Sequence, residues 1–424
     1  MSNEMDLNKS LISRHKIFVG IIIFSISLIL SFLLAERLTR RLAPQTTYNF
    51  AKNRTFAIFQ EDESLPFTLK PNVKDYRFTS NMVEFSNLVS TNSFGFRGKE
   101  ISQEKPKDVY RILLLGDSVT FGWGVEDDQT FAFIAEEALN QWSQEKGLNT
   151  KFEVINGGFT AGRSLDSYYV YIKKEAFKFN PDLVVINHFP ANDYGPDMSE
   201  TEWLELDDKG LPDRVVSKFN TIKNGYQVDI YNRNWKYDIP LLRNSHFGIL
   251  IMSSVDRFTP SSVHLIKKYL LEFPQDVPRL IDSNEIAYCL SILIEKYCPS
   301  ELMALFEKGQ PLISGMKDLA TANSSEIAVA ILPSIQQVED ILRHEDRQSA
   351  VLDAEPQKTL DGFFKKNYIE NLNLLPYFAT SNYKDYFYLR DWHLNKEGHK
   401  LAGEKLAAFI AENYFPSLNP NVSD

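Results

Sequence analysis

A short apolar run carries a serine into a glycine-rich turn at position 118. The stretch from 111 to 124 reads RILLLGDSVTFGWG, so four aliphatic residues are followed directly by Gly-Asp-Ser. A serine hydroxyl becomes a strong nucleophile only when an imidazole takes its proton and a carboxylate orients that imidazole. Gly, Asp and Ser are also common turn residues, so an ordinary loop after a buried strand explains the tripeptide equally well. A catalytic role for Ser118 therefore requires a base and an acid elsewhere in the chain.

The chain around this serine alternates short apolar segments with amphipathic ones. Apolar runs predict strands, and apolar residues at helical spacing predict helices. The strands are expected at 111–115, 152–155, 181–189 and 324–334, and the helices at 131–146, 164–179 and from Asn395 onward. Such alternation predicts an α/β fold with a mostly parallel sheet that helices cover on both faces.

Polar segments follow the predicted strands, where an open α/β sheet gathers its active groups. Ser118 follows the first strand, NGGFTAGRS (156–164) the second and FPANDYG (189–195) the third. The segment RDWHLN (390–395) leads into the last helix. We therefore expect these four segments to meet at one edge of the sheet.

The order of these four segments resembles that of the SGNH (GDSL-type) hydrolases. The resemblance covers about 109–194 and about 327 to the C-terminus, and NSFGFRG (92–98) is similar to the membrane-anchored bacterial members. It implies a flavodoxin-like three-layer sandwich, with Ser118 as nucleophile, His393 as base and Asp391 as acid. It also implies an oxyanion hole formed by the N–H of Ser118, a glycine N–H and the side-chain amide of Asn192.

The chain departs from the family pattern in three of these segments. Pro190 stands where the third block usually has glycine, and Arg390 stands where the last block usually has its acid. The acid is then Asp391 in an Asp-x-His arrangement, which is also found in related alginate O-acetyltransferase-like proteins. The second block carries one extra residue, so its oxyanion glycine is Gly162 or Gly158. Gly162 is favoured because it lies nearer the following helix.

Other residues compete for the catalytic roles. Asp385 and Glu397 are alternative acids, and Thr120 is the nearest alternative hydroxyl. His188 lies inside the third strand, and a hydrogen-bonded core histidine is expected there. His399 is expected to pack or to lie on a helix surface rather than to react.

The N-terminus predicts a retained transmembrane anchor. Residues 17–35 contain no charge, and nineteen residues at about 1.5 Å each approach the ~30 Å hydrocarbon core of a bilayer. Residues 1–16 then form a tail and 36–108 a membrane-proximal region. Three cationic residues lie on each side of the apolar run, so the positive-inside rule gives no orientation. The similarity to anchored members, and envelope esters as substrates, favour a single-pass protein whose catalytic part lies outside the cytoplasm.

The predicted hydrolase domain is split in two. Its parts are 109–198 and 323–424, and 199–322 is expected to be a mainly helical insertion because strand–helix alternation fails there. Its aromatic residues could line a substrate wall for a sugar or an acyl chain, or could simply pack a cap; they include Trp203, Tyr226, Tyr231 and Trp235.

Composition excludes several classes of protein. A net charge of −10 with no basic stripe argues against nucleic acid. Cys289 and Cys298 are too few for a disulfide framework or a four-thiolate zinc site, and buried free thiols are expected. No metal, P-loop or dinucleotide motif is present, so no cofactor is expected.

The sequence thus predicts a membrane-anchored serine esterase acting on an acyl ester, with an acylated glycan or lipid as the partner. An O-acyltransferase acting on a cell-envelope polysaccharide and a non-catalytic binding protein are the alternatives.

Overall fold

The computed structural model describes most of the chain and divides it into two units. The described residues are 2–45, 47, 58–79, 84–159, 164–194, 201–217, 221–223, 226–228, 242–258, 300–344, 346, 354 and 356–415. One unit comprises Met1–Thr55 and Ile230–Pro278, and the other comprises Phe56–Asp229 and Arg279–Asp424. Both predicted parts of the hydrolase domain fall in the second unit. Cys289, Cys298, Tyr231 and Trp235 lie outside the described residues.

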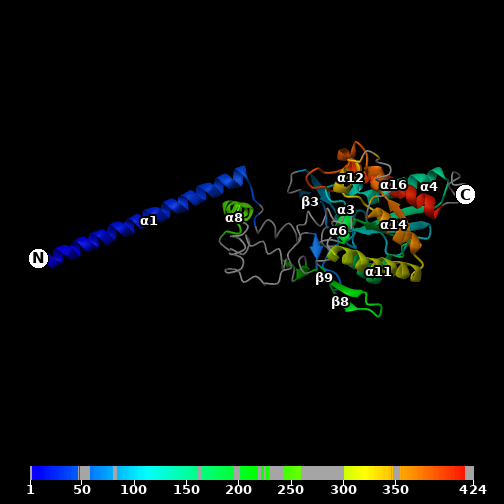
Figure 1. Ribbon diagram of the computed structural model, residues 1–424, viewed down its shortest axis with the longest axis horizontal. Helices are drawn as coiled ribbons and strands as arrows, with labels where there is room; N and C mark the ends of the chain where they lie inside the picture. The colour runs from blue at the N-terminus through cyan, green and yellow to red at the C-terminus, as the bar shows by residue number, and fades with distance from the viewer. Residues whose placement is uncertain are drawn as a thin grey trace. The chain divides into compact units, whose positions relative to one another are not determined.

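A five-stranded parallel sheet forms the centre of the second unit (Figure 1). Its strands in chain order are β5 (Val109–Gly116), β6 (Lys151–Gly158), β7 (Leu183–His188), β12 (Glu326–Ile331) and β13 (Glu370–Asn373). They lie in the order β13-β12-β7-β5-β6, and every pairing is parallel. This is the 2-1-3-4-5 order of flavodoxin-like folds, whose switch point lies between the first and third strands. The predicted doubly wound fold is confirmed.

Alternate residues of each strand enter two separate cores, as the period of a strand requires. In β5, Leu113 and Leu115 belong to one core while Ile112 and Leu114 belong to the other. Helices that supply the first core include α5 (Leu165–Lys174), α11 (Ser300–Ala322) and α14 (Gln357–Lys366). Helices that supply the second core include α4 (Phe131–Glu145), α12 (Ile335–Ile341), α15 (Leu375–Phe378) and α16 (Lys396–Tyr414). The sheet is therefore the middle of three layers.

The strand β13 was not predicted, and the helix expected over 164–179 is shorter than expected. The segment ENLN of β13 has one apolar residue, and it pairs only with β12 because it lies at the edge of the sheet. Helix α5 ends at Lys174, and a 3₁₀ turn follows over Ala176–Phe179. The predicted start of α16 is confirmed, since the Asn395 side chain accepts the N–H groups of Glu397 and Gly398.

Two small hairpins precede the sheet. Strand β1 (Phe59–Gln60) pairs with β2 (Thr68–Leu69), and β3 (Tyr76–Thr79) pairs with β4 (Ser86–Val89), both antiparallel. The segment that follows, NSFGFRG, forms an ordered turn, in which the Asn92 side chain accepts the N–H groups of Phe94 and Phe96. Arg97 then bridges to Asn156 and covers the open edge of β6.

The expected insertion begins with strands rather than helices. Antiparallel hairpins join β8 (Thr201–Leu206) to β9 (Pro212–Ser217) and β10 (Thr221–Lys223) to β11 (Tyr226–Val228). The first is closed by a turn in which Asp207 accepts the N–H groups of Lys209 and Leu211. The sequence did not predict these four strands within the segment expected to be mainly helical, because the polar–apolar alternation over short runs was missed. Helices follow at α8 (His246–Phe258) and α11, and α11 packs against α5 as the helix that leads into β12.

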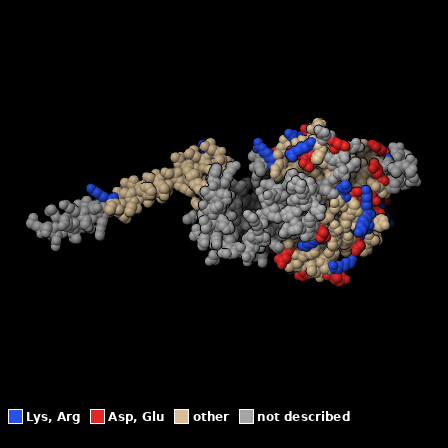
Figure 2. All heavy atoms as spheres, in the orientation of Figure 1, with Lys and Arg blue, Asp and Glu red and all other residues tan. Residues whose placement is uncertain are grey.

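Helix α1 (Ser2–Leu42) belongs to the first unit, and its part Lys16–Leu42 is long and apolar enough to cross a membrane. Near its end, the Glu36 carboxylate accepts the N–H groups of His246 and Phe247 and the hydroxyl of Ser245. Glu36 therefore caps the start of α8 in the same unit. Elsewhere, Figure 2 shows basic and acidic side chains interspersed over the face in view, and no basic stripe runs across the described residues there.

Candidate active site

Ser118 is the first residue of the short helix α3 (Ser118–Phe121), directly beyond β5. The buried Asp117 caps this helix, since its Oδ1 accepts the N–H of Val119 at 2.9 Å. The helix ends at Gly122, whose φ of +89° lies in the left-handed region that favours glycine. This tight strand–turn–helix places the serine hydroxyl at the carboxyl end of β5, at the switch point of the sheet.

Ser118, His393 and Asp391 form one line of hydrogen bonds. The Ser118 hydroxyl lies 2.7 Å from Nε2 of His393, and Nδ1 of His393 lies 2.7 Å from Oδ1 of Asp391. When Nδ1 donates its proton to the carboxylate, Nε2 is left as the acceptor for the serine hydroxyl. The histidine and aspartate side chains are 26% and 16% exposed, so the line is reachable from solvent while the carboxylate is largely shielded.

The shortened Asp-x-His segment lies in a closed loop. The N–H of Trp392 donates to the carbonyl of Tyr388 at 2.8 Å, and the N–H of Tyr388 donates to the carbonyl of His393 at 2.9 Å. Trp392 has a φ of +69°, which is uncommon for a bulky residue. This left-handed residue turns the chain between Asp391 and His393, so their side chains meet despite the missing position.

Glu84, which lies near the N-terminal end of the second unit, hydrogen-bonds to this loop near the C-terminus. Its carboxylate accepts the N–H of Asp391 at 2.7 Å and the N–H of Arg390 at 2.9 Å. Sequence reasoning missed Glu84 because 306 and 307 residues separate it from its partners and no local pattern marks it. Arg390 therefore contributes a backbone N–H to Glu84, whereas the acid contact to His393 comes from its neighbour.

Aromatic rings pack beneath the catalytic histidine candidate. The ring centroid of Trp123 lies 6.2 Å from that of His393, and Phe85 contacts both Trp123 and Tyr388. The hydroxyl of Tyr388 donates to the carbonyl of Gly124 at 2.8 Å. Burial raises the pKa of Tyr388, and the nearby carboxylates of Asp391 and Glu84 raise it further, so the hydroxyl stays protonated as a donor.

Arg97 holds the turn that carries the serine. Its buried guanidinium donates to the carbonyls of Phe121, Gly122 and Val125 at 2.5–2.8 Å, and to Asp127 Oδ1 at 2.8 Å. These carbonyls belong to α3 and the loop after it, where no helical partner is available for them. The NSFGFRG segment thus fixes the serine turn from the side of β6.

Of the two candidate oxyanion glycines, the structure describes Gly158 and does not describe Gly162. The N–H of Gly158 donates to Oδ1 of Asn156 at 3.0 Å, so it already has a partner. A Cβ at Gly158 would lie 2.1 Å from the backbone nitrogen of Phe121, so glycine is required there for close packing against α3. Gly162, the favoured candidate, lies outside the described residues.

Asn192 lies in the short helix α6 (Pro190–Asp193), directly beyond β7, and the placement of its side chain is outside the described part. The next residue, Asp193, is fully buried and fixes this turn. Its carboxylate contacts Nδ1 of His188 at 2.7 Å and accepts the Tyr168 hydroxyl at 3.0 Å and the Phe189 N–H at 2.8 Å. The expectation that His188 is a hydrogen-bonded core histidine is confirmed.

The competing residues do not reach the site. Thr120 is fully buried. Its hydroxyl lies against Gly116, so that a Cβ added to Gly116 would be 2.0 Å from Oγ1 of Thr120. His399 is also buried, accepts the N–H of Phe131 at 3.2 Å and stacks on its ring. Within the described ranges, neither Asp385 nor Glu397 bonds to His393.

The first aromatic residue of the insertion has structural partners. The indole N–H of Trp203 donates to Asp166 Oδ2 at 2.8 Å, and the Lys308 ammonium lies 3.9 Å from its ring centroid. For Trp203 this supports packing rather than a substrate wall. No group of three or more His, Cys, Asp or Glu side chains is placed to hold a metal ion in the part of the chain described here.

Fold and site together define a doubly wound α/β protein with a serine–histidine–aspartate line at the carboxyl edge of its sheet.

No family model matches the sequence, and no curated protein matches it. Solved structures do match. They include a lipase/acylhydrolase from Enterococcus faecalis, at 12% identity over 74% of this chain and 99% of that one, with a TM-score of 0.34. A psychrotrophic esterase from Pseudoalteromonas sp. matches at 10% identity over 72% and 97%, with a TM-score of 0.32. A GDSL-like lipase from Bacteroides thetaiotaomicron matches at 13% over 75% and 93%, with a TM-score of 0.30.

Proposed function

We propose that the protein is a membrane-anchored serine esterase that hydrolyses acyl esters, with an acylated glycan or lipid as substrate. One observation carries the proposal, namely the line from Ser118 through His393 to Asp391 with both heavy-atom distances at 2.7 Å. These distances are within hydrogen-bond reach for a nucleophile, its base and the group that orients the base. Among the described residues, Ser118 is the only serine whose hydroxyl is hydrogen-bonded to an imidazole.

In the first half of the reaction, Nε2 of His393 takes the proton of the Ser118 hydroxyl as the oxygen attacks the ester carbonyl carbon. Asp391 holds the proton on Nδ1 and stabilises the imidazolium that forms. The tetrahedral intermediate collapses when Nε2 gives its proton to the leaving alcohol, which breaks the ester bond and leaves an acyl group on Ser118. Water then attacks the acyl-enzyme by the same route, and the acid is released as the serine regains its proton.

The developing oxyanion requires hydrogen-bond donors at the same edge of the sheet. The N–H of Ser118 lies in the first turn of α3, where a backbone N–H has no partner within the helix. Asn192 and Gly162 are the further donors in this proposal, and each such donor typically lowers the barrier by about 2.7–4 kcal/mol. The commitment of the Gly158 N–H to Asn156 supports Gly162 over Gly158.

Helix α1 is the proposed anchor, and the catalytic unit lies outside the cytoplasm. Fusion of alkaline phosphatase to the C-terminus should give an active phosphatase, and fusion of GFP at the same position should give no fluorescence. The reverse pattern would place the catalytic unit in the cytoplasm.

The test of activity compares the full-length wild type with Ser118→Ala in detergent. The wild type should hydrolyse p-nitrophenyl acetate and react with a fluorophosphonate probe, and the variant should do neither while keeping its thermal unfolding temperature. A series of p-nitrophenyl esters of increasing chain length and a set of acetylated glycans then define the substrate. Turnover that needs an added polysaccharide acceptor would assign acyl transfer to a sugar hydroxyl instead of hydrolysis. No turnover and no labelling of the wild type would leave a binding protein.

A further inference from the structure

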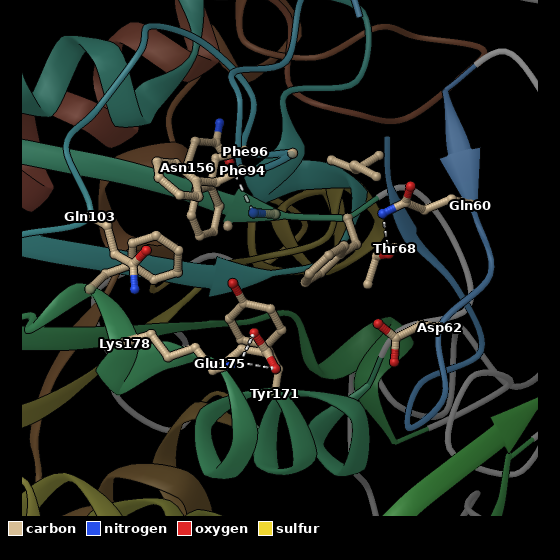
Figure 3. Close-up of a pocket in the computed structure, with 16 residues that line it drawn as sticks. Gln60, Asp62, Thr68, Phe94, Phe96, Gln103, Asn156, Tyr171, Glu175 and Lys178 are labelled. Atoms are coloured by element: carbon tan, nitrogen blue, oxygen red, sulfur yellow. Dashed lines mark hydrogen bonds and ion pairs between the residues drawn. The ribbon is translucent and has the colours of Figure 1, made fainter. Parts of the chain in front are cut away.

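A concave site lies along the edge strand β6. It is a cavity of about 260 Å³ between the hairpin region that precedes the sheet, the end of β6 and the helix α5 (Figure 3). This volume is just below the ~300–1,000 Å³ of typical ligand clefts, so it suits a group the size of one sugar ring. Ser118, His393 and Asp391 do not line it.

Aromatic rings form much of the cavity wall. Phe94 is 39% exposed and packs edge-on against Phe179, with ring centroids 5.2 Å apart. Phe96 also packs against Phe179, with ring centroids 4.9 Å apart, and the ring centroids of Phe159 and Tyr171 are 5.7 Å apart. A ring held by its neighbours offers a rigid apolar surface at little cost in entropy, which suits the C–H face of a pyranose.

Polar groups are distributed between these rings. Figure 3 shows Gln103 and Gln60 towards opposite ends of the cavity, with Tyr171 rising from α5 between them. The Gln60 amide donates to Thr68 at 3.3 Å, which leaves its carbonyl oxygen as an acceptor. The side-chain amide of Gln103, which is exposed, has no bonded partner among the described residues. Amides of this kind both donate to and accept from hydroxyl groups.

The cation of the cavity lining is paired with a carboxylate, and the other carboxylate, that of Asp62, accepts backbone N–H groups. Lys178 lies 2.7 Å from both carboxylate oxygens of Glu175, and Asp62 accepts the N–H groups of Ser64 and Leu65. A phosphate or carboxylate ligand would need an unpaired cation, and the cavity lining supplies none. A plain acyl chain would leave the two amides and the Asp62 carboxylate desolvated without new partners. A neutral ring with many hydroxyl groups can donate to that carboxylate and to the amide oxygens.

We infer that this cavity is a sugar-binding subsite separate from the catalytic line. It is joined to that line through the backbone, because the N–H of Phe159 donates to the carbonyl of Gly116 at 3.0 Å, two residues before Ser118. Gly158 in the same wall packs directly on α3. The inference rests on the proposed function only in taking a glycan ester as the substrate, of which this cavity would hold an unreacted sugar unit.

The binding test uses the full-length Ser118→Ala protein in a detergent without a sugar headgroup, so that turnover cannot consume the ligand. Saturation-transfer NMR is recorded with the methyl glycosides of xylose, glucose, mannose and N-acetylglucosamine, and with sodium octanoate. At least one glycoside should receive saturation from the protein. Phe94→Ala should weaken its binding about tenfold, as expected for loss of a central aromatic contact, and Gln103→Ala should also weaken it.

Phe133→Ala is the matched control, because Phe133 is 40% exposed on α4 and does not line the cavity. It should leave glycoside binding unchanged. Binding of no glycoside, binding of octanoate alone, or equal binding by Phe94→Ala and Phe133→Ala would each overturn the subsite. Glycoside binding without any ester turnover would refute the esterase and keep the subsite, and turnover without glycoside binding would do the reverse.

Discussion

The carboxylate of Glu84 accepts the backbone N–H of Asp391 at 2.7 Å, and so ties the hairpin region before the sheet to the loop that carries the proposed acid. Arg97, from the same region, holds carbonyls at the end of the serine helix and in the loop after it. The two halves of the proposed catalytic line are therefore positioned by one segment of the chain. Residues 84–97 are therefore part of the scaffold of the proposed active site.

Glu84→Ala should lower kcat/KM for p-nitrophenyl acetate by about 10- to 100-fold, because a displacement of about 1 Å at a catalytic group can cost 10²-fold. Glu84→Gln keeps an acceptor oxygen and should lose less. Glu137, an exposed carboxylate on α4, provides the control, and Glu137→Ala should match the wild type. A Glu84→Ala enzyme with wild-type kcat/KM would show that the acid loop holds its geometry without this contact.

Asp391→Asn should cut kcat/KM by about 10⁴-fold while the protein stays folded, because an amide favours the wrong tautomer of the imidazole. Arg390→Ala should be much milder, since a guanidinium has only donors and cannot accept the Nδ1 proton. Asp385→Asn and Glu397→Gln, which remove the competing carboxylates, should stay near wild type. The acid assignment fails if Asp391→Asn is nearly normal and one of these two is crippled.

The parts of the fold that were predictable are those whose patterns are local. The apolar runs of β5, β7 and β12 identify strands buried on both faces, and Asn395 identifies a helix start. Because parallel strands share one carboxyl edge, the positions of Ser118 and His393 at that edge also followed from the sequence.

What was missed depends on contacts between distant residues or on weak patterns. The edge strand β13 is held by backbone pairing to β12 and carries little apolar signal. Glu84 acts through backbone N–H groups, which any residue at 390 and 391 could supply. The role of Gly158 is steric and appears only when β6 is packed against α3, so its spacing in the sequence could not separate it from Gly162.

Gly158→Ala should destabilise the protein by at least about 1–3 kcal/mol, the usual cost of overpacking, because the added Cβ meets backbone atoms of Thr120 and Phe121. It should also lower esterase activity, since those atoms belong to the helix that begins at Ser118.

Gly362→Ala is the matched control. Gly362 lies in α14 with no atom within 4 Å of an added Cβ, so alanine there should stabilise the helix by up to about 1 kcal/mol. Urea unfolding of both variants measures the difference, and equal stabilities would refute the close packing at Gly158.

His399 should make the protein's stability depend on pH. Burial lowers the pKa of His399 to about 3 in the folded protein, with further lowering by Arg97 and His393, from 6.5 in the free side chain. Below pH 6.5 the unfolded chain binds a proton that the folded protein does not, so the free energy of unfolding decreases as the pH falls towards 3. The limiting slope for one such proton is about 1.4 kcal/mol per pH unit.

His399→Asn keeps an acceptor for the Phe131 N–H but cannot titrate, so its unfolding midpoint should fall less steeply than that of wild type between pH 7 and pH 5. His344→Asn, at an exposed histidine, should keep the wild-type slope. Identical slopes for wild type and His399→Asn would mean that His399 binds a proton as readily in the folded protein as in the unfolded chain, and its neutral buried state would then be wrong.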